Sequence, residues 1–228
     1  MLTGVLLTKL ALKLYLSMPL QQIHWNGPAS GWAVWQVSET EEELSSVLPS
    51  GDRCPEEIRF HLKRVEWSAG RHLVRHLFTA AGLTYHGLRK DAFGKPFAVG
   101  SEVQVALSNS FPFVAAQIHP SLPVGIDLEK PRKNLARVLD RILSQAERKD
   151  AGADPKKMLI YWCAKEAMFK IHGERNLVFA RDLSIAPFNR SSKGTIDGSI
   201  KKEGRHAPVR LDYCIHSEYT VVTTNTDE

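Results

Sequence analysis

The sequence predicts an α+β protein made of two similar halves, in each of which a long helix is followed by antiparallel strands. Two stretches, 56–81 and 156–171, have the length and hydrophobic spacing of helices. Each is followed by short segments with strand-like alternation that are bounded by turn residues. The order of helix and strands therefore occurs twice, although no motif is repeated. No low-complexity linker divides the chain, so we expect the halves to pack as one body.

The composition is that of a globular protein with a modest excess of positive charge. The 228 residues are 43% hydrophobic and 24% charged, with a formal net charge of +5 and a pI near 9.1. This charge favours anionic partners such as a nucleotide, an acidic protein or nucleic acid, but it does not choose among them. Three widely spaced cysteines without a CxxC pair, Cys54, Cys163 and Cys214, indicate a reduced cytoplasmic protein without structural zinc.

The first 17 residues are apolar but are not expected to span a membrane. Two lysines interrupt the run, and it lacks the charged start and unbroken apolar core of a secretory signal. Met18 offers an alternative start. The expected organisation is a peripheral extension at 1–17, an N-terminal α+β half at 18–124 and a C-terminal α+β half at 125–228.

The N-terminal half is predicted to begin with a strand and a short helix. Residues 32–37 have the alternation of a strand, and Ser38 followed by Glu41 is a capping-box pattern that predicts a helix over 41–48. A longer helix is predicted over 56–81. The polar positions of this longer helix are heavily basic: Arg59, Lys63, Arg64, Arg71 and Arg75.

A hairpin and a further strand follow the long helix. The loop FGKPF at 93–97 precedes two strands, 103–108 and 113–119, which a turn at 109–112 joins into an antiparallel hairpin. The segment GIDLEK at 125–130 then adds a third strand.

The C-terminal half is predicted to repeat the pattern. A polar helix is expected near 134–150, and a strongly apolar helix from 156 to 171. Strands are expected at 182–188, 209–215 and 219–224. The polar, glycine-containing stretch 189–206 predicts a surface loop or a mobile hairpin.

Two carboxylates interrupt the apolar strand at 125–130. Side chains alternate along a strand, so Asp127 and Glu129 point to one face while Ile126 and Leu128 point to the other. Neighbouring anions repel each other, and burying them without compensation is costly. We therefore expect a positive group between the two carboxylates.

A second pair of charged residues lies on the most apolar helix. In YWCAKEAMFK, residues 161–170, Glu166 and Lys170 are four positions apart and share one side of the helix. On an exposed helix such a pair is a simple surface ion pair with a small stabilising effect. A helix that is apolar nearly all round is buried, however, and this favours a functional role for the pair.

Together the acids predict an oxygen-rich site for magnesium. Asp127, Glu129 and Glu166 would supply three carboxylates without a histidine or cysteine ligand, a donor set that suits Mg²⁺. The cation would cancel the repulsion between the carboxylates and would also bind substrate phosphates. Lys170, one turn beyond Glu166, could reach a phosphate oxygen that the same cation holds.

These two segments resemble the signature motifs of the 4′-phosphopantetheinyl transferases. GIDLEK and WCAKEAMFK are similar to the family patterns G-[IV]-D-x-E and W-x-x-K-E-[AS]-x-x-K, in the same order. Their separation and the chain length resemble the larger, surfactin-synthetase-activating type. FGKPF resembles the GKP loop of the family, and LSNS takes the place of its Ser-His-Ser turn. The likeness covers residues from about 56 to 190.

The resemblance implies a fold, a reaction and a set of partners. The family has two similar α+β halves with coenzyme A bound in the cleft between them. It transfers phosphopantetheine from coenzyme A to a serine of an acyl or peptidyl carrier protein and releases adenosine 3′,5′-bisphosphate. The reaction uses Mg²⁺, and family members of this length usually act as monomers. The expected partners are therefore coenzyme A and a carrier protein, and neither a nucleic acid nor a membrane is expected.

The resemblance also implies a role for each matching residue. Asp127, Glu129 and Glu166 match the metal ligands, and Glu166 is further expected to take the serine proton as general base. Lys170 is expected to stabilise the charge that develops on the phosphates. The residues expected to bind coenzyme A are Lys63, Arg64, Arg71, Lys95, Pro96, Ser108, Asn109 and Lys165.

Two other functions stay open at the level of the sequence. A metal-dependent nuclease would use an acid followed by E-x-K on the next strand; the letters of Glu147-Arg148-Lys149 agree, but they lie in a polar helical segment. That hypothesis leaves Glu166 and Lys170 without a role. A non-catalytic nucleic-acid-binding module would use the basic helix, but the three acids would oppose a phosphate backbone unless a metal intervened.

One departure from the family pattern yields a prediction. Asn109, between Ser108 and Ser110, stands where many relatives have histidine. An amide can donate to a phosphate oxygen but carries no charge. We expect Asn109→His to lower the KM for coenzyme A, most clearly below a pH of about 6.5, where imidazole is protonated. Steady-state kinetics across a pH series checks this. An unchanged KM would show that residue 109 does not contact the phosphate.

Overall fold

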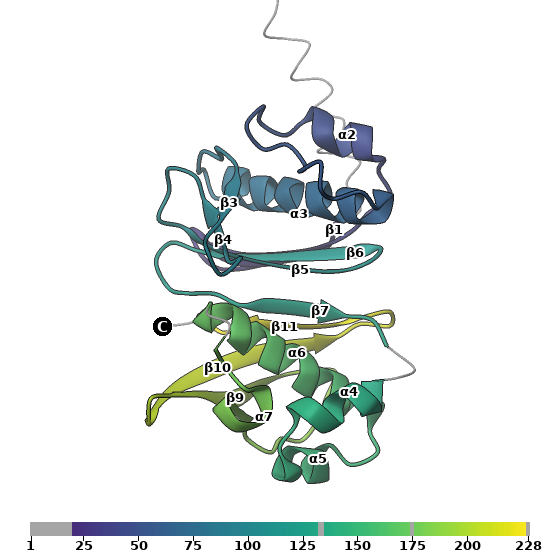
Figure 1. Cartoon of the computed structure of the whole chain (residues 1–228), viewed down its shortest axis with the longest axis vertical. Helices are drawn as coiled ribbons and strands as arrows, with labels where there is room; N and C mark the ends of the chain where they lie inside the picture. The colour runs from purple at the N-terminus through teal and green to yellow at the C-terminus, as the bar shows by residue number, and fades with distance from the viewer. Residues whose placement is uncertain (1–19, 132–134, 174–175, 227–228) are drawn as a thin grey trace, which may run out of the picture.

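The computed structural model describes residues 20–131, 135–173 and 176–226, and it contains two antiparallel sheets, each with a long helix packed on one face (Figure 1). The α+β class predicted from the sequence is confirmed. The expected extension at 1–17 lies outside the described residues. In the part of the chain that the structure describes, no helix is both long and apolar enough to cross a membrane.

The first sheet has six strands in the order β1-β2-β6-β5-β4-β3. Its strands are β1 (Leu20–Gly27), β2 (Ser30–Gln36), β3 (Leu88–Lys90), β4 (Pro96–Ala98), β5 (Gln104–Ser110) and β6 (Phe113–His119). Its helices are α2 (Glu41–Ser46) and α3 (His61–Ala80). The apolar face of α3, with Leu73 and Leu77, packs on inward-facing residues of β5 and β6 such as Val105 and Val114 and forms the core of this half.

The second sheet has five strands in the order β7-β11-β10-β9-β8. Its strands are β7 (Ile126–Glu129), β8 (Leu183–Ile185), β9 (Lys193–Lys202), β10 (Arg205–Ile215) and β11 (Thr220–Thr224). Its helices are α4 (Leu135–Ile142), α5 (Gln145–Ala151), α6 (Pro155–His172) and α7 (Phe179–Asp182). Helix α6 crosses this sheet, and its buried residues Ile160, Ala164 and Met168 form a second core with strand residues such as Leu211 and Val222.

The two halves share one topology. Apart from β1, the first strand of each half pairs with the last strand, and the other strands follow in reverse order of sequence. The order is β2-β6-β5-β4-β3 in the first half and β7-β11-β10-β9-β8 in the second. The long helix, α3 or α6, lies between the first strand and the rest in both. Strand β1 is an additional edge strand of the first sheet.

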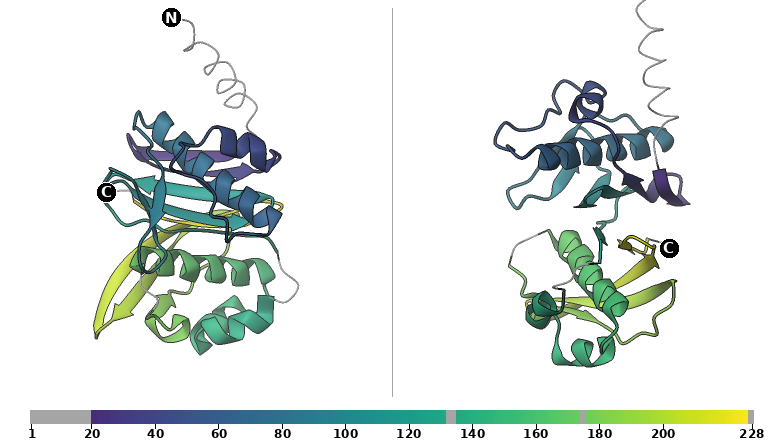
Figure 2. Two further views of the ribbon diagram at one scale, coloured as in Figure 1. Left: turned by 45° about the horizontal axis from the view of Figure 1, so that its top comes forward. Right: turned by 90° about the vertical axis from the view of Figure 1, so that its right-hand side faces the viewer.

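A third apolar cluster joins the two sheets. It contains Ala106, Phe113 and Ala115 from the first sheet and Ile126 and Leu128 from β7, all buried. Figure 2 shows the two halves stacked on each other, and this cluster lies between their sheets. The strand alternation predicted for β7 is therefore observed, with its aliphatic residues against the first sheet and its acids on the other face.

Several elements differ from their predicted bounds for local physical reasons. The capping box of α2 is formed by Thr40 and Glu43, two residues after the expected cap Ser38. Helix α3 begins at His61, because the residues after Pro55 form turns instead of a helix.

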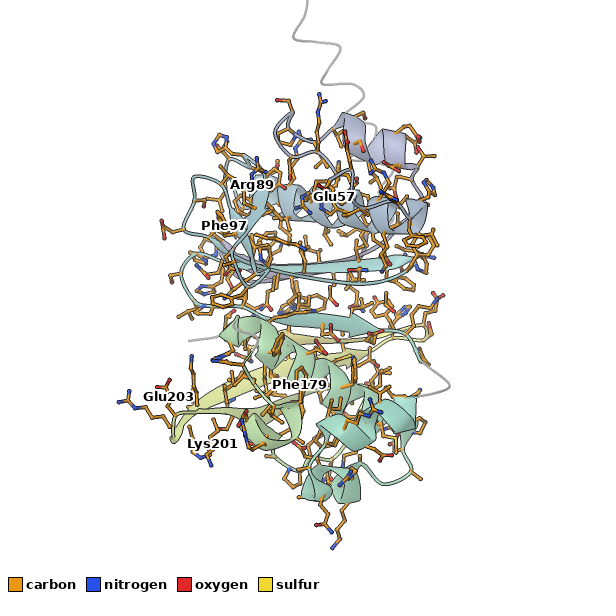
Figure 3. All side chains as sticks on the ribbon, viewed as in Figure 1. Glu57, Arg89, Phe97, Phe179, Lys201 and Glu203 are labelled. Carbon is orange, nitrogen blue, oxygen red and sulfur yellow. The ribbon has the colours of Figure 1, made fainter. Side chains whose placement is uncertain are left out.

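The C-terminal half departs from expectation in two places, the helix expected over 134–150 and the pairing of β7. The expected helix 134–150 is two helices, because Ser144 caps α5 in a capping box with Glu147. In the polar stretch 189–206, where a surface loop or a hairpin was expected, β9 and the start of β10 form a hairpin, which extends from the body with Lys201 and Glu203 near its tip (Figure 3). Strand β7 pairs with β11 and does not extend the preceding hairpin.

Four elements were not predicted, because they carry too little hydrophobic periodicity: the edge strand β1, the short strands β3 and β4, and helix α7.

A glycine allows α6 to approach β7. A Cβ atom at Gly125 would lie 2.0 Å from the carbonyl oxygen of Ala167 and 3.0 Å from the Ile171 side chain. No side chain is compatible with the first of these distances, so the contact between α6 and the start of β7 requires glycine. This contact fixes the acids of β7 relative to the charged residues of α6.

We expect Gly125→Ala to lower the free energy of unfolding by at least about 2 kcal/mol, because the backbone of α6 must move away from β7. Gly70→Ala is the matched control. A Cβ atom there would lie 3.5 Å from Leu107, which is ordinary contact, and alanine favours a helix interior. Urea unfolding of both variants checks this. Equal stability of the two variants would contradict the close approach of α6.

Candidate active site

Two serines of β5 hold the two carboxylates of β7. Ser108 Oγ donates to Asp127 Oδ1 at 2.7 Å, and Ser110 Oγ donates to Glu129 Oε2 at 3.0 Å. Each hydroxyl also accepts a backbone hydrogen bond: Ser108 from the amide of Leu128 in β7, and Ser110 from the amide of Lys130, the residue just after β7. Because both strands have a period of two, a two-residue spacing on β5 matches the spacing of the acids. The serines therefore fix the carboxylates and cap the free edge of β7.

Lys170 of α6 places a positive group beside Asp127, one of the two acids. Its Nζ lies 2.8 Å from Asp127 Oδ1 and donates at 2.8 Å to the carbonyl oxygen of Ile126. The other carboxylate oxygen, Asp127 Oδ2, is buried and has no hydrogen-bond partner in the described part of the chain. A buried carboxylate oxygen without a donor is unfavourable, so this atom is available to a ligand.

Glu166 lies on α6 one turn before Lys170. Burial raises the pKa of its carboxyl group to about 7, and the negative charges of Asp127 and Glu129 act in the same direction, while Lys170 opposes them. The three acids therefore interact electrostatically. Ordinary glutamate is fully ionised at neutral pH, whereas this one is close to its midpoint there.

The donor set suits a hard divalent cation, but the side chains do not converge on one position. Asp127, Glu129 and Glu166 offer carboxylate oxygens, one of which has no partner. Among the described residues, however, no group of three or more histidine, cysteine, aspartate or glutamate side chains is arranged to hold a metal ion. The ammonium of Lys170 instead neutralises Asp127. A shared cation at these acids stays a prediction.

A cavity of about 540 Å³ opens beside this cluster. Its walls come from α3, from the segment before it, from β5, from the loop before β4 and from the C-terminal end of α6. Six cationic residues line it: Arg59, Lys63, Arg71, Lys90, Lys95 and Lys170. Ser108 and Lys170 belong both to the cavity wall and to the cluster of acids, so the two features are continuous.

Six of the residues expected to bind coenzyme A line this cavity: Lys63, Arg71, Lys95, Pro96, Ser108 and Asn109. Lys63 pairs with Glu66, at 2.6 Å, and its side chain is largely exposed. Asn109 is exposed and, by strand alternation, points away from the carboxylates that Ser108 contacts. Lys95 Nζ donates at 3.3 Å to the carbonyl oxygen of Ile171, so the loop before β4 is tied to the end of α6.

Arg64 lies outside the cavity lining. Its Nε donates to Glu41 Oε1 at 2.6 Å, and its Nη1 donates to the carbonyl oxygens of Pro55 and Ile58. These contacts tie α3 to α2 and to the preceding turn. The side chain thus has a structural task in place of the expected contact with coenzyme A.

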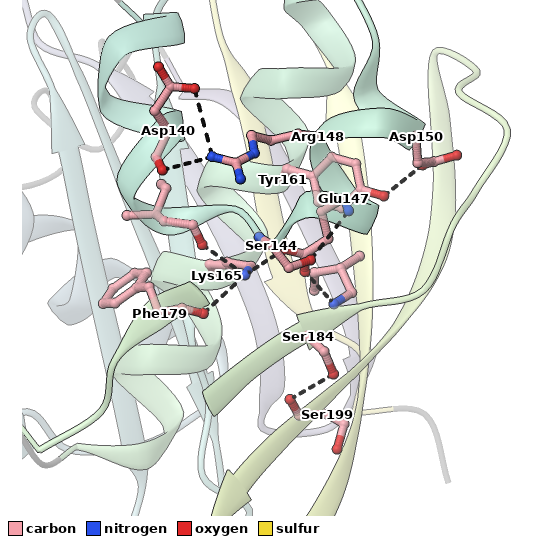
Figure 4. A network of polar contacts seen from close by, with 12 residues as sticks. Asp140, Ser144, Glu147, Arg148, Asp150, Tyr161, Lys165, Phe179, Ser184 and Ser199 are labelled. Atoms are coloured by element: carbon pink, nitrogen blue, oxygen red, sulfur yellow. Dashed lines mark hydrogen bonds and ion pairs between the residues drawn. The ribbon is translucent and has the colours of Figure 1, made fainter. Parts of the chain in front are cut away.

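Lys165 also lies outside the cavity lining, and its side chain points into a network of polar contacts in the second half (Figure 4). Its side chain is fully buried, and its Nζ lies 2.8 Å from Glu147 Oε2 and donates to the carbonyl oxygens of Ile142 and Phe179, at 2.9 Å and 3.0 Å. Burial lowers the pKa of this ammonium, and Glu147 opposes the shift. The expectation that Lys165 binds coenzyme A is therefore corrected: it connects α6 with α4, α5 and α7.

Glu147, the acid of the Glu147-Arg148-Lys149 segment considered for a nuclease, belongs to the same network as Lys165. Its Oε1 accepts from the amide of Ile185 at 2.9 Å and its Oε2 from the amide of Ser144 at 2.7 Å. A carboxylate buried among these donors is not free for catalysis on a nucleic acid.

Several cavity residues were not singled out as ligands from the sequence. The sequence marks Arg59 only as a basic residue of the predicted helix 56–81, and Lys90 lies in the short strand β3, where no pattern marks it. Trp67 lies under the guanidinium of Arg71, at 3.4 Å from ring centroid to Arg71 Cζ. Trp67 and Arg71 are four residues apart on one helix, a spacing that predicts contact between the two side chains.

Comparison with known proteins connects this site to one superfamily. Residues 123–223 match the family model of the 4′-phosphopantetheinyl transferase superfamily. The matched segment contains Asp127, Glu129, Glu166 and Lys170. A search of curated proteins found no significant match. The match supports a transferase acting on phosphopantetheine, and the two antiparallel sheets with their helices are consistent with the fold of that superfamily.

The network of Lys165 generates a stability prediction. Lys165→Met should lower the free energy of unfolding by about 3–5 kcal/mol, because it leaves the Glu147 carboxylate buried without its counter-charge. Lys156→Met, at an exposed position on the same helix, should change it by less than about 0.5 kcal/mol. Chemical denaturation measures both. Wild-type stability of the Lys165 variant together with weakened coenzyme A binding would instead restore the role expected from the sequence.

Proposed function

We propose that this protein transfers the 4′-phosphopantetheine group from coenzyme A to a serine of an acyl or peptidyl carrier protein and releases adenosine 3′,5′-bisphosphate. We further propose that it is of the larger, surfactin-synthetase-activating type, with both halves in one chain. The observation that carries this proposal is the continuity between the acid–lysine cluster of β7 and α6 and a cavity lined by six cations, within a chain whose second half matches the superfamily.

The cavity supports coenzyme A as the ligand. A volume of about 540 Å³ lies in the range of small-molecule and cofactor sites. The cations lining it are suited to a ligand with several phosphates, and apolar residues such as Leu107, Val114 and Phe169 offer a surface to its uncharged parts. The walls come from both halves, so a ligand there would contact α3 and α6 together.

Asp127, Glu129 and Glu166 are the residues that would hold Mg²⁺. When bound, the cation would polarise the phosphoryl group under attack and neutralise charge on the departing bisphosphate. The unpartnered Oδ2 of Asp127 supports this assignment, since it is a buried acceptor that lacks a donor among the described residues. Ser108 and Ser110 would orient two of the three carboxylates through the hydrogen bonds described above.

The side chains of α6 would handle the proton and the developing charge. In the transfer, the serine oxygen of the carrier forms a bond to the phosphorus next to the pantetheine, and the bond from that phosphorus to the bridging oxygen of the pyrophosphate breaks. The serine proton passes to the Glu166 carboxylate, directly or through water. Lys170 stabilises the additional negative charge on the phosphate oxygens.

The proposed reaction predicts a change in carrier mass. The protein with Mg²⁺, coenzyme A and an apo carrier protein should add one phosphopantetheine arm to the carrier, as measured by intact mass spectrometry. Glu166→Gln should slow this reaction by about 10²–10⁴-fold, since general-base catalysis contributes on that order. Lys156→Met should retain the wild-type rate, because the residue is exposed and distant in sequence from the cluster.

Two further measurements separate the transferase from the nuclease alternative. Mg²⁺ binding, followed by titration calorimetry, should be lost in Asp127→Asn even where no carrier is present. Cleavage of DNA without modification of any carrier in a panel of fatty-acid, polyketide and nonribosomal-peptide carriers would contradict the transferase and favour the nuclease.

A further inference from the structure

The three arginines of α3 have different surroundings. Arg64 donates to a carboxylate and to backbone carbonyl oxygens, and Arg75 Nη1 donates to the carbonyl oxygen of Val47. Both therefore fasten the segment between α2 and α3 to the helix. Of the three, Arg71 lines the cavity. Its side chain is mostly buried, with 7% of the residue surface exposed.

The guanidinium of Arg71 is held on one edge and one face. Its Nε donates at 2.7 Å to Asp52 Oδ1, and its planar group lies 3.4 Å from the ring centroid of Trp67. An ion pair on the Nε edge and a stacking contact on the face together define the plane and the rotation of the group. The two terminal amino groups, Nη1 and Nη2, are not used by either contact.

Asp52 is itself held from several sides. It is 1% exposed, and its Oδ2 accepts a hydrogen bond from the Tyr85 hydroxyl at 2.5 Å. Burial raises the pKa of this tyrosine, so the hydroxyl remains a donor at physiological pH. A Cβ atom at Gly87, whose φ is +107°, would lie 3.2 Å from Asp52 Cβ, so the chain passes close over the aspartate there. A carboxylate fixed in this way can in turn fix the guanidinium.

We propose that Asp52 and Tyr85 are positioning residues, which turn the terminal amino groups of Arg71 toward the cavity so that they bind the 3′-phosphate of coenzyme A. This inference rests on the proposed function. A guanidinium with a free Nη1–Nη2 edge binds phosphate oxygens through parallel hydrogen bonds, and its affinity depends on a fixed orientation.

The assignment to the 3′-phosphate follows from the two walls of the cavity. Lys170 and the acids belong to α6 and β7 of the second half, where the pyrophosphate would react. Arg71 belongs to α3 of the first half. Coenzyme A carries its phosphates at two places, a pyrophosphate and a phosphomonoester on the ribose. With the pyrophosphate at the wall formed by α6 and β7, the 3′-phosphate is assigned to the opposite wall, where Arg71 lies.

The test compares two ligands that differ only in this phosphate. Binding of coenzyme A and of 3′-dephospho-coenzyme A is measured by titration calorimetry for each variant. Wild-type protein should prefer coenzyme A by about 10-fold or more, the effect of charge-assisted hydrogen bonds to one phosphate. In Asp52→Ala the preference should fall to about 2-fold or less, because the guanidinium is no longer oriented. The affinity for the dephospho ligand should stay within about 2-fold.

Two conservative variants and a control distinguish orientation from a loss of folding. Asp52→Asn should keep the preference, because an amide oxygen still accepts from Arg71 Nε. Tyr85→Phe should lower the preference by about 3-fold, since it removes one of the bonds that hold Asp52. Arg75→Ala, on the same helix but outside the cavity lining, should keep it. In the transfer reaction, Asp52→Ala should raise the KM for coenzyme A and leave kcat unchanged.

The outcomes separate the inference from the proposed function. If wild-type protein binds neither ligand, the proposed function fails, and the inference fails with it. If wild-type protein prefers coenzyme A but Asp52→Ala weakens both ligands equally, or keeps the preference, the positioning role is wrong while the proposed function stands. If Asp52→Ala does not fold, Tyr85→Phe decides: an unchanged preference in that variant overturns the inference.

Discussion

The burial of two carboxylates side by side on β7 is the constraint on which the rest of the site depends. Asp127 and Glu129 are 5% and 8% exposed, so their charge cannot be left to solvent. Hydroxyl groups from β5 and the ammonium of Lys170 compensate it from two directions. The hydroxyls belong to the first half and the ammonium to the second. The electrostatic balance of the site is therefore reached only when the halves are docked.

The common topology of the halves clarifies how the tasks are divided between them. Each half contributes its long helix to the cavity, but the two helices carry different chemistry. Helix α3 brings cations whose neighbours are other side chains of the first half. Helix α6 brings a lysine into contact with the first strand of its own sheet, and an acid whose pKa is raised by the charges of that strand. Similar backbones thus form two unlike walls, as would suit a ligand that is bound at one end and reacts at the other.

The sequence was sufficient for the class of the fold and for the cluster of acids, because both depend on local periodicity. Strand alternation placed Asp127 and Glu129 on one face, and helical spacing placed Glu166 and Lys170 on one side of α6. Long-range partners could not be predicted in this way. The partner of Lys165 is Glu147, which caps a helix that was expected to be continuous with the preceding one.

The basic residues of α3 show the same limit more sharply. Arg64 and Arg71 are seven residues apart, so they differ by only about 20° around the helix axis and periodicity cannot separate them. Their roles differ because α2 and the turn after Pro55 cover the first, while Asp52 and the cavity border the second. Those neighbours come from irregular segments, whose placement depends on tertiary contacts.

The serine hydroxyls that cap the free edge of β7 come from the first half, so the second half on its own would lack this cap. A chain carrying the second half alone would present unpaired amides along that edge and would expose Ile126 and Leu128 to water. Open edges and apolar patches of this kind are covered by association with another chain. Joining both halves in one polypeptide makes that cover intramolecular, and the acidic centre then forms at any protein concentration.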